Sequence, residues 1–269
     1  MITEPILPAA AREEFVSELF HENTKQRRSD ARFIERIVAA AFDPTVQSVM
    51  GPSHKLYRNA KVFALPTRLP KAKQTFDDAV LSRRSSREFG KDPLPLNVAA
   101  KLLHCSYGIT GELDLGHGHR QALRAAPSGG ALYPIEIYLF ARNVEKLPKG
   151  IYHFNSGERS LEQITAKDPF PELIKATYAD ELRNAALVMA ITGVSLKNRV
   201  KYGERGYRFM LFEAGHIVQN FLLAANAMRL NAFAVGGFVD DELDAMLRVD
   251  GFEETSLYLA AAGRPPRSR

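Results

Sequence analysis

The stretch from Arg199 to Asn220, RVKYGERGYRFMLFEAGHIVQN, sets the plan of the chain. It opens as a basic, glycine-spaced segment and continues as a mostly apolar one. The apolar part predicts a helix over 206–228, because its hydrophobic residues recur at spacings of three and four. Lys201 and Tyr202 lie in the basic part, which we expect to be a loop. A loop anchored on a core helix holds its side chains firmly enough to form a site.

Three polar residues, Glu213, His216 and Asn220, form a separate stripe along the same predicted helix. Polar groups on so apolar a helix need hydrogen-bond partners or must face a cavity. The stripe therefore fits a structural network inside the core or one wall of a site, and the sequence leaves both interpretations open.

The composition is that of an ordinary globular protein: 269 residues, 45 % hydrophobic and 25 % charged. The single Cys105 excludes an internal disulfide, and neither a signal peptide nor an apolar run of about 20 residues is visible. We expect a cytoplasmic protein without a membrane partner.

The net charge of +5 comes from basic residues spread along the chain, and no nucleic-acid motif accompanies them. His117 and His119 have metal-like spacing, but no third ligand joins them, so no metal is expected.

The order of predicted elements indicates an α+β fold. Helices are predicted over 9–20, 33–42, 77–84, 96–107, 170–182, 206–228 and 241–247. Strands are predicted over 135–141, 187–194, 232–235 and 256–262, with a hairpin over 150–164, a short strand within 54–65 and a loop over 111–119. Because strands and helices mix without strict βαβ repetition, we expect a sandwich with a mainly antiparallel sheet flanked by helices. We predict a helical N-terminal extension over 1–74 and a main domain over 75–269.

A candidate phosphate site lies at the end of the helix predicted over 77–84. The segment 83–87 reads RRSSR and places three guanidinium groups and two hydroxyls within five residues. Arginine binds phosphate through a planar fork of two donors, and serine adds a short hydrogen bond. An exposed basic helix end is an equally good interpretation. Arg264, which follows the last predicted strand, would complete a two-sided clamp.

Two glycine-rich points allow a backbone to approach a flat ligand closely, because glycine has no Cβ. The first is the loop of Pro127, Ser128, Gly129 and Gly130, and the second is the pair Gly236 and Gly237 after a predicted strand. Neither matches a Walker loop or a dinucleotide-binding fingerprint. Taken alone, each is more typical of an ordinary turn.

The adjacent residues Lys201 and Tyr202 are the candidates for proton transfer. A lysine acts as a base only when neutral, which requires burial or cationic neighbours, and Arg199, Arg205 and Arg208 are close in sequence. A tyrosine can donate or relay a proton. From the residues alone, a solvated loop is the more common explanation of such a pair.

Several segments occur together in a specific order: Arg124, PSGGALYPIE at 127–136, GIYH at 150–153, KYGERGYR at 201–208, and Glu213, Gln219 and Asn220. In this order they resemble the nitroreductase superfamily of FMN enzymes. More closely, they resemble the azoline dehydrogenases of the microcin synthase type, which oxidise azolines to thiazoles and oxazoles in ribosomally made peptides. The likeness covers roughly 75–264.

The resemblance implies roles for the candidate residues. Lys201 and Tyr202 match the catalytic pair. The implied cofactor contacts are Arg83, Ser85, Arg87 and Arg264 for the FMN phosphate and ribityl chain, Pro127, Ser128 and Gly129 for the ring, commonly from the second subunit, and Gly236 and Gly237 for the ring edge. It also implies a nitroreductase-like sandwich, a homodimer with two flavins at its interface, a complex with a cyclodehydratase and its partner protein, and a precursor peptide as substrate.

The implied reaction removes a proton from one ring carbon and a hydride from its neighbour, with the azoline stacked on the flavin. Lys201 would take the proton, Tyr202 would relay it or position the ring, and oxygen would reoxidise the flavin. Two other functions remain open at this point: an NAD(P)H-dependent nitro or quinone reductase, and a flavin-binding scaffold subunit of a peptide-modifying complex.

Overall fold

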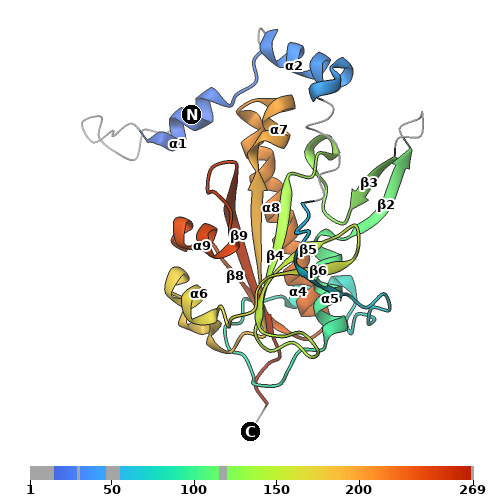
Figure 1. Ribbon diagram of the computed structural model, residues 1–269, viewed down its shortest axis with the longest axis vertical. Coiled ribbons are helices and arrows are strands. Elements are labelled where there is room, and N and C mark those ends of the chain that lie inside the picture. The colour runs from blue at the N-terminus through green and yellow to red at the C-terminus, as the bar shows by residue number, and fades with distance from the viewer. Residues whose placement is uncertain (1–14, 29–30, 47–54, 115–119, 268–269) are drawn as a thin grey trace.

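The protein is built around a seven-stranded, wholly antiparallel sheet with the strand order β1-β6-β5-β4-β7-β9-β8 (Figure 1). The computed structural model describes residues 15–28, 31–46, 55–114 and 120–267. The strands are β1 Lys61–Ala64, β4 Ile135–Ala141, β5 Gly150–Asn155, β6 Ser160–Thr165, β7 Leu187–Val194, β8 Asn231–Val235 and β9 Glu254–Gly263. The expected α+β sandwich with a mainly antiparallel sheet is therefore confirmed.

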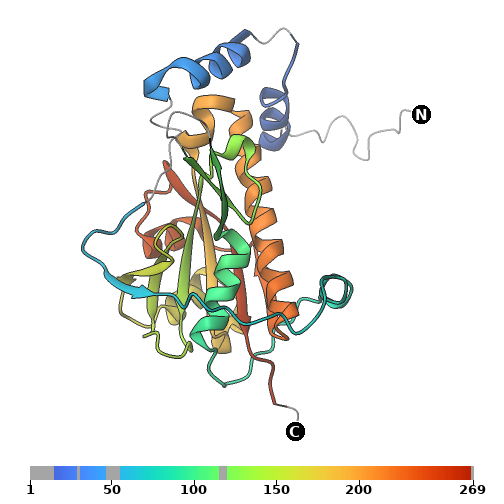
Figure 2. The same cartoon turned by 90° about the vertical axis from the view of Figure 1, so that its right-hand side faces the viewer.

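Helices cover both faces of the sheet (Figures 1 and 2). One face packs against α5 (Leu96–Tyr107) and the long α8 (Arg205–Ala227), whose lower end contacts α4 (Phe76–Ser82). The other face packs against α6 (Phe170–Thr177) and α9 (Asp240–Leu247). Successive side chains of a strand point to opposite faces, so the sheet divides the core into two layers.

The middle of the sheet shows why the strand predictions succeeded there. The apolar run of β7 is flanked by β4 and β9 and has both faces covered, as its unbroken hydrophobic pattern indicates. On β4, Ile137 and Leu139 face the layer of α5 and α8, whereas Tyr138 and Phe140 face the layer of α6 and α9. Burial on both sides is what holds the elements around the candidate site in place.

The prediction of a basic loop around Lys201 and Tyr202 is wrong in one respect. The first part of this segment belongs to a helix, α7 (Ser195–Tyr202). Lys201 and Tyr202 therefore occupy the last turn of a helix. Residues 195–202 contain no glycine or proline, and lysine and arginine are good helix formers. The basic composition of this segment is therefore compatible with a helix. Gly203 ends α7 with a φ of 57°, and α8 begins two residues later.

Two further expectations need correction. The loop predicted over 111–119 is in its described part a strand, β2 (Ile109–Asp114), paired with β3 (Arg120–Arg124), and an ion pair of 3.1 Å joins Glu112 to Arg120. His117 and His119 lie outside the described residues. The helix predicted over 170–182 ends at Thr177 because Tyr178 adopts a φ of 50°, and the 3₁₀ turn η3 (Asp180–Asn184) follows.

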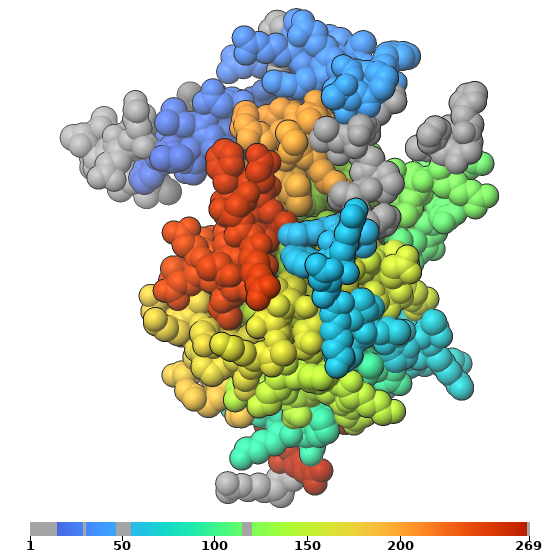
Figure 3. Space-filling view, viewed as in Figure 1, coloured from blue at the N-terminus to red at the C-terminus, as the bar shows by residue number. Residues whose placement is uncertain are grey.

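The N-terminal segment contributes two helices and one strand. α2 (Ala31–Phe42) packs against α7, and α1 (Val16–Asn23) lies against the start of α8, where Phe20 contacts Tyr207. Both helices lie at the α7 end of the molecule (Figure 3). Further along, β1 pairs with β6 at the sheet edge, and Lys55 forms an ion pair with Glu254. The boundary at residue 74 stays a prediction, and residues 9–14 of the first predicted helix lie outside the described residues. Among the described helices, none has the length and apolar character needed to cross a membrane.

Candidate functional site

The glycine-rich loop and the lysine–tyrosine pair meet in space. Gly130 has a φ of 65°, and a Cβ added to it would collide with the Tyr202 hydroxyl and lie 2.9 Å from Lys201 Nζ. The loop therefore rests directly on the last turn of α7. Only glycine suits this position, for both its backbone angle and its neighbours. Two segments that the sequence singled out separately, more than 70 residues apart, thus form one structure.

Aromatic packing and one hydrogen bond fix this arrangement. The Tyr202 ring lies edge-on to Phe209 of α8, with 4.8 Å between ring centroids, and Phe209 also backs Gly129. The Tyr133 backbone N–H donates to the Ser128 hydroxyl at 2.9 Å, which closes the loop on itself. The loop, α7 and α8 therefore hold one another in a set geometry around Tyr202.

Glu213 of α8 lies beneath the loop, only 1 % exposed. Burial raises its pKa to about 7, against the opposing influence of the Ser128 and Tyr107 hydroxyls and the charges of Arg124 and Lys197. Its Oε1 accepts a hydrogen bond of 2.5 Å from Tyr107, and its Oε2 has no hydrogen-bond partner among the described residues. A carboxyl with this pKa changes charge near neutral pH.

The polar stripe predicted along this helix does not act as one unit. Glu213 is buried, whereas His216 is exposed and Asn220 is half-buried. At 3.6 residues per turn, His216 is turned about 60° from Glu213 around the helix axis, whereas Asn220 is turned by only about 20°, which agrees with its partial burial. The site interpretation of the stripe therefore applies to Glu213 alone.

Lys197 is a functional candidate that the sequence reasoning missed. It lies one turn before Lys201 on the same side of α7 and is 5 % exposed. Burial lowers its pKa to about 8, the Arg124 charge acts in the same direction, and Glu136 and Glu213 oppose it. The signal was the i, i+4 spacing of two lysines, which carries meaning only once this segment is known to be helical.

A buried polar network continues from here into the sheet. The Arg124 guanidinium lies 4.4 Å from the centre of the Tyr107 ring and donates to the Ser156 hydroxyl at 2.6 Å. His153 lies between Glu136 at 3.0 Å and Glu162 at 2.9 Å. Burial lowers the pKa of His153, but its hydrogen bonds and the charges of the two carboxylates outweigh this and raise it.

The candidate phosphate residues gather in a different part of the chain. After α4, the segment 83–89 runs beside β8, where the Ser86 N–H donates to the Ala232 carbonyl at 3.0 Å. The Arg87 guanidinium lies 5.3 Å from the Phe233 ring centre. Arg83 is half-buried, and Ser85 and Arg87 are exposed and face solvent beside the strand.

Arg264 joins this group through backbone contacts. It follows β9 directly, its carbonyl accepts from the Gly90 N–H at 2.8 Å, and its Nε donates to the Pro93 carbonyl at 3.0 Å. Gly236 and Gly237 follow the other end of β8 and are exposed. A Cβ at Gly237 would meet nothing within 4 Å, so this backbone is open to a flat ligand.

The predicted site residues thus form two groups within one chain. Lys201, Tyr202 and the loop from Pro127 lie at the α7 end of the molecule, opposite the C-terminus, and the arginines lie beside the lower part of β8 and β9 (Figure 1). None of the contacts found among the described residues joins the two groups directly.

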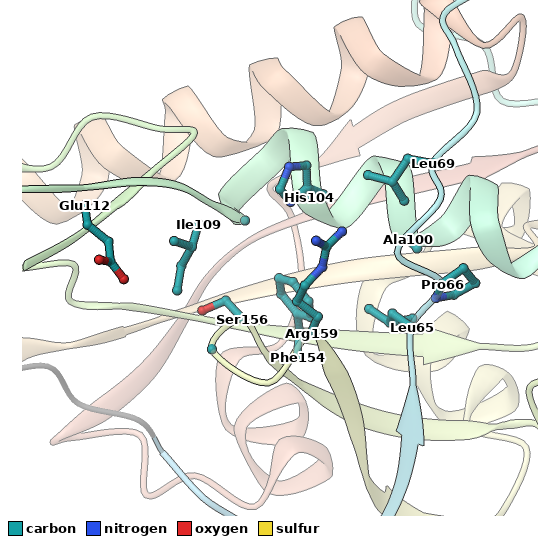
Figure 4. A pocket seen from close by; sticks show the side chains of 12 residues that line it. Leu65, Pro66, Leu69, Ala100, His104, Ile109, Glu112, Phe154, Ser156 and Arg159 are labelled. Carbon is teal, nitrogen blue, oxygen red and sulfur yellow. The ribbon is translucent and has the colours of Figure 1, made fainter.

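A separate pocket of about 310 Å³ lies between α5, the segment after β1 and the β5–β6 turn (Figure 4). Arg159 extends across it toward His104, and Leu65, Leu69 and Phe154 form apolar walls. Burial, and then the charges of Arg159 and Lys101, lower the pKa of His104. This pocket includes none of the predicted site residues.

These features define an α+β oxidoreductase of nitroreductase-like fold. The family model described as "Nitroreductase family" matches residues 80–264, and the chain belongs to that family. The resemblance drawn from the sequence is confirmed at this level.

The relatives of this chain include proteins of two kinds. The chain is 31 % identical over 189 residues to the "Putative nitroreductase MJ1384" of Methanocaldococcus jannaschii, covering 70 % of this chain and 90 % of that protein. It is 32 % identical over 135 residues to the "Microcin B17-processing protein McbC" of Escherichia coli, covering 47 % of this chain and 49 % of that one. The fold resembles a chain of the E. coli microcin synthetase McbBCD complex with truncated pro-MccB17 bound, with a TM-score of 0.57, 22 % identity and coverage of 94 % and 92 %.

Proposed function

We propose that this protein oxidises thiazoline or oxazoline rings to thiazoles or oxazoles in a ribosomally made peptide, with FMN as its cofactor. The observation that carries the proposal is the contact of Lys201 and Tyr202 with Gly130. That contact unites the segments most specific to azoline dehydrogenases in one place. The likeness to McbC supports the same assignment.

The residues present fit FMN. Arg83 and Arg87 have no carboxylate partner among the ion pairs of the described residues, and both lie beside a strand that leads to the open backbone of Gly236 and Gly237. Free guanidinium groups suit a phosphate, and a backbone without Cβ atoms suits the edge of a planar ring. When bound, FMN supplies a two-electron acceptor for the ring that is oxidised.

The chain's own residues perform the proton chemistry. Lys201 Nζ takes the proton from the ring carbon, and the Tyr202 hydroxyl, held by Phe209 and the loop, positions the ring or relays that proton. Lys197 lies one turn before Lys201 on α7, and Glu213 lies near Ser128 of the loop; their pKa values are about 8 and about 7. Both can accept or return a proton near neutral pH.

A homodimer would complete the site by joining the two groups of residues from different subunits. Leu211 and Phe212 on α8 and Phe76 and Leu81 on α4 are exposed in the single chain. A Cβ at Gly215, also on α8, would meet nothing within 4 Å, so another helix can approach closely there. In the cell we expect this dimer to work with a cyclodehydratase, its partner protein and a precursor peptide.

The test uses purified, FMN-loaded protein and a synthetic peptide containing one thiazoline. We expect a yellow protein that forms thiazole and consumes oxygen, followed by mass spectrometry as a loss of two hydrogens. A yellow protein that binds its partner proteins but never oxidises an azoline would instead be a flavin-binding scaffold. A protein that takes up no FMN would rule out both functions.

A second candidate is an NAD(P)H-dependent nitro or quinone reductase. The match to the nitroreductase of Methanocaldococcus jannaschii favours it, since it covers most of that relative. Rapid bleaching of the flavin by NADH or NADPH, with turnover of a nitroaromatic and none of the azoline peptide, would establish this function.

A further inference from the structure

A basic pocket of about 290 Å³ lies where the N-terminal helices meet the α7–α8 turn. Its walls include Lys25 after α1, Arg32 and Arg36 of α2, and Tyr202 and Arg205 on either side of the turn. The extension and the helix pair of the candidate site therefore form this pocket together.

The positive charge of the pocket is largely uncompensated. Lys25 pairs with Glu22, and Glu204, the carboxylate in the lining, pairs with Arg199 at 2.8 Å. In contrast, neither Arg32 nor Arg36 has an ion-pair partner in the part of the chain that the structure describes. Two free guanidinium groups four residues apart on one helix face can bind the same anion.

Arg205 adds a third donor. Its Nη1 donates to the Thr24 carbonyl at 3.1 Å, but its Nε is buried and has no hydrogen-bond partner among the described residues. A buried charged donor without a partner is unfavourable unless a ligand satisfies it. Its position beside the pocket is therefore a second sign of an anionic ligand.

The pocket adjoins the reacting groups. Tyr202 lines it and also contacts the loop at Gly130. Arg36 lies along the turn, since a Cβ at Gly203 would collide with its guanidinium group. A ligand held here is next to the ring that Lys201 and Tyr202 would act on.

We propose that this pocket binds a carboxylate of the substrate peptide next to the azoline ring, so that the N-terminal extension helps to select the substrate. The proposal rests on the proposed function. A peptide offers carboxylates from aspartate or glutamate side chains or from its C-terminus, and guanidinium groups bind either through paired hydrogen bonds.

A binding experiment tests the pocket without requiring turnover. FMN-loaded full-length protein is titrated against a rhodamine-labelled glycine–serine nonapeptide with two aspartates, and against the same peptide with two asparagines, by fluorescence anisotropy. We expect the aspartate peptide to bind about tenfold more tightly, and Arg36→Gln or Arg32→Gln to remove most of that difference. Peptides with a free or an amidated C-terminus distinguish the two sources of carboxylate.

Arg58→Gln is the matched control, because Arg58 is exposed and lies outside the pocket. Arg36→Lys, which keeps the charge but not the fork, should recover part of the binding. Equal binding of the aspartate, asparagine, free and amidated peptides, or an equal effect of Arg36→Gln and Arg58→Gln, would overturn the proposal.

A kinetic experiment separates this proposal from the proposed function. With thiazoline peptides that carry aspartate or asparagine beside the ring, Arg36→Gln should raise KM about tenfold for the aspartate peptide and leave kcat nearly unchanged. If no azoline is oxidised but the aspartate peptide still binds preferentially, the function is wrong and the pocket stands. If both peptides, each with a free and with an amidated C-terminus, are all oxidised with the same KM, the function stands and the pocket assignment is wrong.

Discussion

The two groups of candidate residues differ in how they are built. At the α7 end, Lys201, Tyr202 and Gly130 touch within one chain, and Ser128 of the same loop lies near the buried carboxyl of Glu213. Beside β8, Arg83 is half-buried and Arg87 is exposed, and both are placed by backbone contacts of their segment.

This contrast separates two tasks. The α7 end sets distances between groups by close packing, which proton transfer requires. The segment of Arg83 and Arg87 presents positive charge beside β8, to which its backbone is hydrogen-bonded. Such an arrangement is sufficient to bind a phosphate. Substitutions at the first end should therefore alter rate, and substitutions at the second should alter cofactor affinity.

Lys201→Ala is the strongest test of this division. We expect azoline oxidation to fall about 10²–10⁴-fold because the proton acceptor is lost. Its FMN content should stay normal, measured from the visible absorbance. Lys71→Ala, at an exposed lysine, serves as the control. A flavin-loaded Lys201→Ala enzyme that works at the normal rate would disprove the assigned role.

Glu213→Gln tests whether burial at the α7 end raises the pKa of the Glu213 carboxyl. The pKa of Glu213 is raised from 4.5 to about 7, so its contribution to stability is complete below pH 4.5 and is lost as the pH rises toward 7. Relative to the Gln variant, the wild type should lose roughly 3 kcal/mol of unfolding free energy across that range. Urea unfolding at pH 4.5 and pH 8 measures it.

The matched substitution for this comparison is Glu158→Gln, at an exposed glutamate. It should shift stability equally at the two pH values. If Glu213→Gln also differs from the wild type by the same amount at both, folding does not raise the pKa of this carboxyl.

Gly130→Ala tests the contact itself. The added methyl group would displace the Tyr202 hydroxyl and force alanine into a positive φ, so we expect a loss of stability of about 1–2 kcal/mol and about a tenfold lower rate at saturating FMN. Thermal unfolding and thiazole formation measure the two effects. Gly111→Ala, whose Cβ meets nothing within 4 Å, should change neither. Identical behaviour of the two variants would contradict the contact.

Arg87→Gln tests the other end and has the smallest expected effect. FMN binding should weaken about tenfold, because one charge-assisted hydrogen bond to the phosphate is lost. The rate at saturating FMN should not change. Arg84→Gln is a close control, since the Arg84 guanidinium donates to backbone carbonyls of its own segment. Flavin fluorescence titration compares them, and equal affinities would remove Arg87 from the phosphate site.

Local patterns predicted much of the fold. The helix over 96–107 and the strands over 135–141 and 187–194 have the predicted bounds, because their hydrophobic periods and terminal glycine or proline residues are local signals. The helical nature of 195–202 was missed, since a polar helix that packs against distant segments has a weak local pattern.

The site was predictable in its parts but not in its arrangement. The family resemblance singled out Lys201 and the loop, but their contact depends on how α7 leaves β7. Lys197 was missed because its pKa depends on burial beneath other elements, which no spacing in the sequence reveals. The roles of the cofactor residues stay predictions until the experiments above are done.

The pairing of β1 with β6 has a consequence for how the chain is made. Lys61 of β1 pairs with Gln163 of β6, so this strand leaves the ribosome long before its partner exists. Because the ribosome adds 5–20 residues per second, β6 is synthesised roughly 5–20 s after β1. The helices α1 and α2 wait longer still, because α7 and α8, which they contact, are made later than β6. The first part of the protein to be synthesised is therefore among the last to dock, and a nascent chain exposes its N-terminal helices to other proteins before they dock.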